Sequence, residues 1–99
     1  MKFYTAESFL AEAAKTLADR GQSYDSSEGE RSMAKTVELF NLRTGLNLTE
    51  THGWIFQGCL KDVRQNAAGG KHEDSAVDKI CYALLEAESR FRDRMNTQS

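Results

Sequence analysis

Apolar residues recur along this chain at intervals of three and four, which is the spacing of amphipathic helices. The first such stretch runs from about Thr5 to Arg20, and Gly21 follows it in a position that favours the end of a helix. Its predicted buried face consists of Ala6, Phe9, Leu10, Ala13, Ala14 and Leu17. The next residues, 22–30, are polar and rich in turn formers, so we expect a loop there.

The second predicted helix starts at a cap formed by Ser26 or Ser27 and reaches about Thr44, where Gly45 ends it. Its predicted buried stripe consists of Met33, Val37, Phe40 and Leu42.

The third predicted helix begins after Thr49, a natural N-cap, with Leu48 placed to pack against the first turn. Its wide apolar face consists of Ile55, Phe56, Cys59, Leu60 and Val63, extended by Trp54. Trp54 has two interpretations: a core residue, or a residue of an oligomer interface, where aromatic side chains are enriched.

Gly69 and Gly70 separate this helix from the last one, which is predicted from about His72 to Met95. The apolar stripe of the last helix consists of Val77, Ile80, Cys81, Leu84, Leu85, Phe91 and Met95. Four amphipathic helices with short links predict an all-α fold, a compact bundle of about four helices. We expect one helical domain over residues 1–95 and a flexible tail over 96–99.

Composition narrows the class of protein. With 99 residues, 39% hydrophobic and 28% charged, the chain is typical of one ordinary globular domain. A net charge of −2 argues against nucleic-acid binding, which usually requires a basic surface. No apolar run approaches the roughly 20 residues that span a bilayer, and no signal-peptide segment is recognisable. Two cysteines among apolar residues are typical of a reducing compartment, so we expect a cytoplasmic protein.

A polar site is predicted near the start of the last helix. Asp74, Asp78 and Tyr82 recur at intervals of four and therefore share one helical face. Asp74 suits a helix N-terminus, whereas Asp78 lies one turn further in and needs a cation, a metal ion or a ligand group beside it. Two carboxylates one turn apart would suit Mg²⁺, the one cofactor that this pattern indicates.

A structural alternative for Asp78 is an ion pair with Lys61, Arg64 or Lys79. Lys61 and Arg64 are three residues apart and share a face of the third helix. If the last two helices pack antiparallel, this basic pair approaches Asp74 and Asp78. The four side chains then form a salt-bridge network, which we favour, or half of a phosphate-binding pocket.

No catalytic residue is predicted. His52 and His72 lack the spacing of metal ligands, and each stands at a predicted helix start, where a surface role is expected. Neither a Ser-His-Asp nor a Cys-His arrangement is recognisable from spacing.

Three short elements resemble a family of small uncharacterised phage and prophage proteins. They are Asp19-Arg20-Gly21-Gln22-Ser23-Tyr24, Lys61-x-x-Arg64 and Asp74-Ser75-x-x-Asp78-x-x-x-Tyr82-Ala83, and together they cover about residues 19–86. The chain departs from that family at Asp25, where glycine usually follows the tyrosine.

That family is in turn similar to the all-α nucleoside-triphosphate pyrophosphatases of the MazG type. These are oligomeric helical bundles that bind Mg²⁺ through Glu-x-x-Glu on one helix and Glu-x-x-Asp on the next. The resemblance implies that Asp74 and Asp78 correspond to the second pair and Lys61 to a phosphate contact. The spacing here is four instead of three, and the second predicted helix offers only Glu38 in its middle. Half of the expected metal cage is missing, which favours binding over hydrolysis.

The function that we expect is therefore non-catalytic. A phage or prophage accessory protein, a homo-oligomer inside the bacterial host cell, would bind a nucleotide-like anionic ligand or a host protein and so modulate host metabolism or defence. The predicted ligand-binding residues are Lys61, Arg64, Asp74, Asp78 and Tyr82. One alternative is a Mg²⁺-dependent nucleoside-triphosphate pyrophosphohydrolase with Asp74 and Asp78 as metal ligands. Another is a host-protein inhibitor that acts through an apolar helix face.

Overall fold

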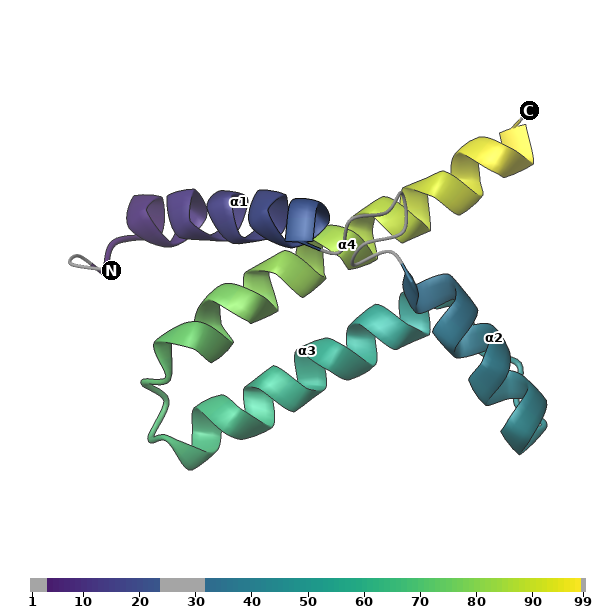
Figure 1. The fold of residues 1–99 in the computed structure, drawn as a ribbon, viewed down its shortest axis with the longest axis horizontal. Helices are drawn as coiled ribbons and strands as arrows, with labels where there is room; N and C mark the ends of the chain where they lie inside the picture. Colours follow the sequence, from purple (N-terminus) through teal and green to yellow (C-terminus); the bar gives the residue numbers. More distant parts are fainter. Residues whose placement is uncertain (1–3, 24–31, 99) are drawn as a thin grey trace.

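A computed structural model describes residues 4–23 and 32–98, with side chains over 4–20 and 32–92 (Figure 1). These residues form four helices and no strand: α1 (Ala6–Ser23), α2 (Met33–Thr44), α3 (Glu50–Ala67) and α4 (Glu73–Gln98). The prediction of an all-α bundle of about four helices is confirmed.

Helix α4 organises the bundle. It forms an antiparallel pair with α3 and also contacts α1, while α2 packs across the start of α3 (Figure 1). Within the described residues, α1 contacts no helix except α4, and α2 contacts none except α3. The bundle therefore depends on two helix pairs that share α4, with α2 attached to one side.

Two small clusters form the core. Between α1 and α4, Ala13, Val77 and Cys81 are buried, and Phe9, Leu17 and Ile80 pack around them. Between α3 and α4, Trp54 is only 1% exposed and its indole stacks on the ring of Tyr82. Trp54 is thus a core residue of the single chain, as the first of its two interpretations predicts, and not an exposed residue of an oligomer interface.

The turns follow the predicted glycines and caps. Gly45 ends α2 with φ of 73°, and its N–H donates to the Asn41 carbonyl at 2.8 Å. Thr49 is the N-cap of α3, where its N–H donates to Nδ1 of His52 at 2.9 Å. Between α3 and α4, Gly69 and Gly70 adopt φ of 68° and 78°, a region that favours glycine because it has no Cβ.

Three predicted boundaries differ from the structure. Helix α1 continues through Gly21 to Ser23, so the prediction that Gly21 ends it is wrong. A glycine inside a helix costs only about 1 kcal/mol, which the surrounding turns can offset. Helix α2 starts at Met33 after Ser32, and the predicted caps Ser26 and Ser27 lie outside the described residues. Helix α4 extends to Gln98, into the segment predicted as a tail.

Of the apolar face predicted for α3, Trp54 is buried and Leu60 half-buried, but the other residues are exposed in the single chain. Phe56 and Val63 are 70% and 65% exposed, and Cys59 is exposed as well. Helix α4 instead meets a face of α3 that includes two polar residues, Thr51 and Lys61. Both have partners on α4, because Thr51 shares a 2.7 Å hydrogen bond with Ser89 and Lys61 pairs with Asp78. These pairs offset the cost of burying polar groups.

Other predicted core positions are also exposed. The described chain leaves large apolar side chains uncovered on all four helices: Leu10 on α1, Phe40 and Leu42 on α2, and Leu84 and Phe91 on α4, besides those on α3. Periodicity identified these residues as apolar faces, but packing within one chain covers only part of each face.

Candidate functional site

Asp78 is the centre of a polar cluster that joins three helices. It lies on α4 with only 8% of its surface exposed. One carboxylate oxygen, Oδ1, accepts a hydrogen bond from Nη2 of Arg20 on α1 at 2.6 Å. The other oxygen, Oδ2, lies 3.0 Å from Nζ of Lys61 on α3. A single carboxylate therefore connects α1, α3 and α4.

The two cations compensate for the cost of burying the negative charge of Asp78. A buried charge is costly unless it is both paired and hydrogen-bonded, and each oxygen of Asp78 has a cationic partner. Of the three partners that the sequence suggests for Asp78, the structure uses Lys61. Arg64 is exposed, and Lys79 instead pairs with Asp62 at 2.6 Å.

Sequence reasoning did not find Arg20 as a partner of Asp78. The two residues are 58 positions apart, and no spacing rule connects them. The one available signal was that Arg20 and Asp78 both occur in the elements that resemble the phage family. Had those elements been assumed to meet in space, the pair could have been proposed.

Tyr82 belongs to the same seam between α3 and α4. Its ring centroid lies 5.8 Å from that of Trp54, with 24° between the ring planes, and Nζ of Lys61 lies 6.0 Å from the Tyr82 ring centroid. The Trp54 indole N–H donates to Glu50 at 3.0 Å, and Arg92 donates to the same carboxylate at 2.8 Å. Tyr82 thus packs within the bundle, half-buried.

Asp74 lies apart from this seam. It is exposed and lines a cleft of ≈ 300 Å³ between α1 and α4, together with Glu12, Thr16, Arg20, Glu73, Val77 and Asp78. In the described part of the chain, no three His, Cys, Asp or Glu side chains converge to hold a metal ion. Asp74 and Asp78 therefore both border this cleft, whereas Tyr82 packs against Trp54 and Lys61 between α3 and α4.

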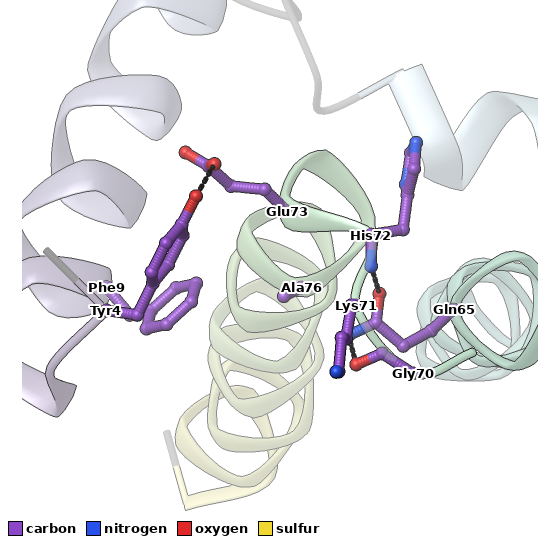
Figure 2. Close-up of a pocket in the computed structure, with 8 residues that line it drawn as sticks. All are labelled: Tyr4, Phe9, Gln65, Gly70, Lys71, His72, Glu73 and Ala76. Carbon is purple, nitrogen blue, oxygen red and sulfur yellow. Dashed lines mark hydrogen bonds between the residues drawn. The ribbon is translucent and has the colours of Figure 1, made fainter. Parts of the chain in front are cut away.

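A second pocket lies where the N-terminus of α1 approaches the turn between α3 and α4 (Figure 2). Its volume is ≈ 380 Å³, and its lining combines two aromatic rings with charged and polar groups: Tyr4, Phe9, Gln65, Gly70, Lys71, His72, Glu73 and Ala76. Most of these residues belong to the turn between α3 and α4 and to the start of α4, and none of the five predicted ligand-binding residues is among them. The pocket as such was not predicted.

Gln65 holds the turn on the α3 side of this pocket. Its side-chain amide donates to the Gly70 carbonyl and accepts from the His72 N–H, both at 3.0 Å (Figure 2). The Gly70 N–H also donates to the Gln65 carbonyl at 2.7 Å. Lys71 therefore stands on a turn whose backbone is fixed on both sides.

His72 completes the turn as a cap of α4. Its Nδ1 accepts a hydrogen bond from the Ser75 N–H at 3.2 Å, and Ser75 Oγ lies 2.6 Å from the same nitrogen. The ring points away from the aromatic pair in Figure 2. Like His52 on α3, His72 has a structural role at a helix start.

The aromatic side of the pocket comes from Phe9 of α1 and from Tyr4, which lies just before that helix. The Tyr4 and Phe9 ring centroids lie 6.1 Å apart with 37° between the planes. The Tyr4 hydroxyl donates to Oε2 of Glu73 at 3.0 Å, which ties the start of α1 to the start of α4. This hydrogen bond and the negative charge of Glu73 raise the pKa of Tyr4 above its ordinary value, because both disfavour the tyrosinate.

The pocket has two ends of different character. In Figure 2, Tyr4, Phe9 and Glu73 lie toward α1, whereas Lys71 and Gly70 lie toward α3. At the α1 end, the contact between Tyr4 and Glu73 joins residues that are 69 positions apart in the sequence. No local sequence pattern could indicate that contact, and this is why the pocket was missed.

Comparison of the chain with family models, with curated proteins and with solved structures found no match. The resemblance to the phage family and to the MazG-type enzymes therefore stays a prediction. Among the described residues, no helix is both long enough and apolar enough to cross a membrane.

Proposed function

We propose that this protein is a non-catalytic binding protein whose ligand is a small nucleotide-like anion. The observation that carries the proposal is the pocket between α1 and the α3–α4 turn, which combines an aromatic pair with a lysine on a fixed turn. Its volume of ≈ 380 Å³ lies in the usual range for small-molecule sites, about 300–1,000 Å³.

The chemistry of the lining suits the parts of a nucleotide. A base would stack on Phe9 and Tyr4, since aromatic side chains accept any base through its π-face. The Lys71 ammonium would pair with a phosphate as a point charge. The carboxylate of Glu73 can accept hydrogen bonds from an exocyclic amino group of the base.

In this proposal, most of the ligand-binding residues predicted from the sequence hold the helices together and do not contact the ligand. Lys61, Asp78 and Tyr82 join α3 to α4, and Arg20 connects α1 to the same carboxylate. Because the pocket lies between α1 and the α3–α4 turn, this cluster supports the spacing of its walls. Asp74 and Arg64 are exposed and do not line this pocket.

A thermal-shift screen tests the proposal, using canonical and cyclic nucleotides with and without Mg²⁺. We expect at least one nucleotide to stabilise the protein and to be recovered intact. The variant Lys71→Ala should lower the affinity for that ligand about tenfold or more, as loss of a charge-assisted hydrogen bond does. Lys15→Ala removes an exposed lysine of α1 that does not line the pocket, so it should bind like wild type.

Two outcomes contradict the proposal: no stabilisation by any nucleotide, or an affinity that Lys71→Ala leaves unchanged. A phage or prophage origin and a role in host metabolism or defence are supported by the sequence resemblance alone. Purifying the protein from infected or lysogenic cells and identifying any bound small molecule would test that part.

The Mg²⁺-dependent pyrophosphohydrolase is the second candidate. The carboxylates that border the cleft between α1 and α4, among them Glu12 and Asp74, favour it. The commitment of Asp78 to two cations weighs against it. Release of pyrophosphate from a nucleotide, dependent on Mg²⁺ and lost in Asp74→Asn, would establish hydrolysis. Asp74 is the better test position, since it is exposed and its replacement leaves the Asp78 cluster intact.

The third candidate is an inhibitor of a host protein. The uncovered apolar side chains of α2 and α3 favour a role in protein association. A host protein captured specifically by the wild type, and lost when those side chains are made polar, would support it.

A further inference from the structure

Helix α3 carries an uncovered apolar surface that the single chain does not use. Ile55, Phe56, Cys59 and Val63, here called the α3 strip, are all exposed. At about 100° per residue, these four positions fall within an arc of roughly 100° on one side of the helix. The strip therefore has the width and the spacing of a helix–helix contact.

The strip continues onto α2. Phe56 borders a groove of ≈ 300 Å³ between α2 and α3, and Phe40 and Val37 line the α2 side of the same groove. Phe40 is also exposed. The apolar surface thus crosses from one helix to its neighbour instead of ending at a single side chain.

The exposed area of the chain is large for its mass. It amounts to 7179 Å², whereas a compact monomer of 11.1 kDa exposes about 5,700 Å². The radius of gyration is 14.9 Å against about 13 Å for a compact domain of this length. Exposed apolar side chains of α2 and α3, among them Phe40, Phe56 and Val63, contribute to this exposed area.

We infer that a second copy of this chain covers the α3 strip, with the two α3 helices antiparallel about a two-fold axis beside Cys59. Three of the four strip positions are symmetric about Cys59, which lies four residues from both Ile55 and Val63. Reversal about Cys59 places Ile55 of one copy opposite Val63 of the other and Phe56 opposite Asp62, so the apolar match holds for Cys59 and for the outer pair. In this arrangement Ile55 of one copy packs against Val63 of the other.

The charges beside the strip agree with this arrangement. Asp62 is adjacent to Val63 in sequence, but its carboxylate pairs with Lys79 on α4, so its charge is compensated within one chain. The strip itself contains no charged residue, and charged residues are depleted at the centres of protein interfaces. This inference does not depend on the ligand pocket, which lies between α1 and the α3–α4 turn.

Sedimentation velocity across protein concentrations tests the inference on the full chain. Wild type should sediment as a dimer, and Ile55→Lys or Val63→Glu should each sediment as a monomer with an unchanged helical circular dichroism spectrum. Leu10→Lys is the matched control, because it introduces the same charge at an exposed apolar residue of α1. That control should remain a dimer.

Mixing the variants tests the antiparallel register. An equimolar mixture of Ile55→Lys and Val63→Glu should form dimers again, since each mixed pair keeps one native Ile55–Val63 contact and gains one Lys–Glu contact. A short bismaleimide should join wild-type chains through Cys59, because Cys81 is buried. A wild type that stays monomeric at all concentrations, or a dimer that both charged variants preserve, would overturn the inference.

Discussion

Lys61 and Asp78 form an ion pair of 3.0 Å between α3 and α4, although neither side chain is more than 12% exposed. Arg20 adds a second cation from α1 at 2.6 Å from the same carboxylate. Removal of one member of such a cluster leaves buried charges without compensation.

Replacement of Asp78 should therefore be strongly destabilising. We expect Asp78→Asn to lower the free energy of unfolding by about 3 kcal/mol, because Arg20 and Lys61 lose their shared counter-charge. Urea denaturation followed by circular dichroism measures the change. Asp62→Asn removes the exposed pair with Lys79 and should cost less than about 1 kcal/mol. Equal losses in the two variants would contradict the structural role of Asp78.

Two glycines of α3 should respond in opposite ways to alanine. A Cβ at Gly53 would collide with Met33 Sδ and lie 3.0 Å from Val37 Cγ2, whereas a Cβ at Gly58 meets nothing within 4 Å. We expect Gly53→Ala to destabilise by up to about 2 kcal/mol, because overpacking between α2 and α3 costs about 1–3 kcal/mol and outweighs the roughly 1 kcal/mol gained in helix propensity. Gly58→Ala should stabilise by about 1 kcal/mol through helix propensity. Thermal unfolding of both variants checks the difference in sign.

The Glu50 carboxylate should help to keep the Trp54 indole buried, because it accepts the hydrogen bond of the indole N–H. In Glu50→Ala the indole N–H loses its acceptor, which should cost about 1–3 kcal/mol and shift the fluorescence of this single tryptophan to longer wavelength. Glu88→Ala also removes a partner of Arg92, but from an exposed position. Its effect should stay below about 0.5 kcal/mol with unchanged fluorescence. A shift in Glu88→Ala as large as that in Glu50→Ala would be inconsistent with this role.

The Tyr4 hydroxyl should lose its proton at a higher pH than that of an ordinary tyrosine, because its pKa is raised. Its pKa is raised because the hydroxyl donates to Glu73 and because the carboxylate repels the tyrosinate. The folded state holds the proton more tightly than the unfolded state, so the stabilisation is complete below the unfolded pKa and is lost as the pH rises through the raised pKa.

Absorbance titration of tyrosinate, taken as the difference between wild type and Tyr4→Phe, isolates this group. The pKa of Tyr4 should fall toward its ordinary value in Glu73→Gln, which removes the negative charge. The variant Glu12→Gln is the control, since it removes an acidic residue of α1 that does not line this pocket. An unchanged Tyr4 titration in Glu73→Gln would show that the contact does not form in solution.

The sequence alone determined the elements of this protein. Periodic apolar residues indicated all four helices, and Gly45, Thr49 and the Gly69–Gly70 pair marked boundaries that the structure confirms. These features depend on interactions within a few residues, through backbone conformation and capping, so they can be recognised locally. Lys61 as a partner of Asp78 was also predictable, because an antiparallel pair of neighbouring helices brings the two together.

Only the tertiary structure decided which faces pack and where a pocket forms. Periodicity shows that α3 has an apolar face, yet α4 contacts the side with Thr51 and Lys61, because their partners Ser89 and Asp78 compensate for burial. The contacts of Arg20 with Asp78 and of Tyr4 with Glu73 span 58 and 69 residues. Such contacts depend on how whole helices are arranged in space, and no spacing along the chain encodes that arrangement.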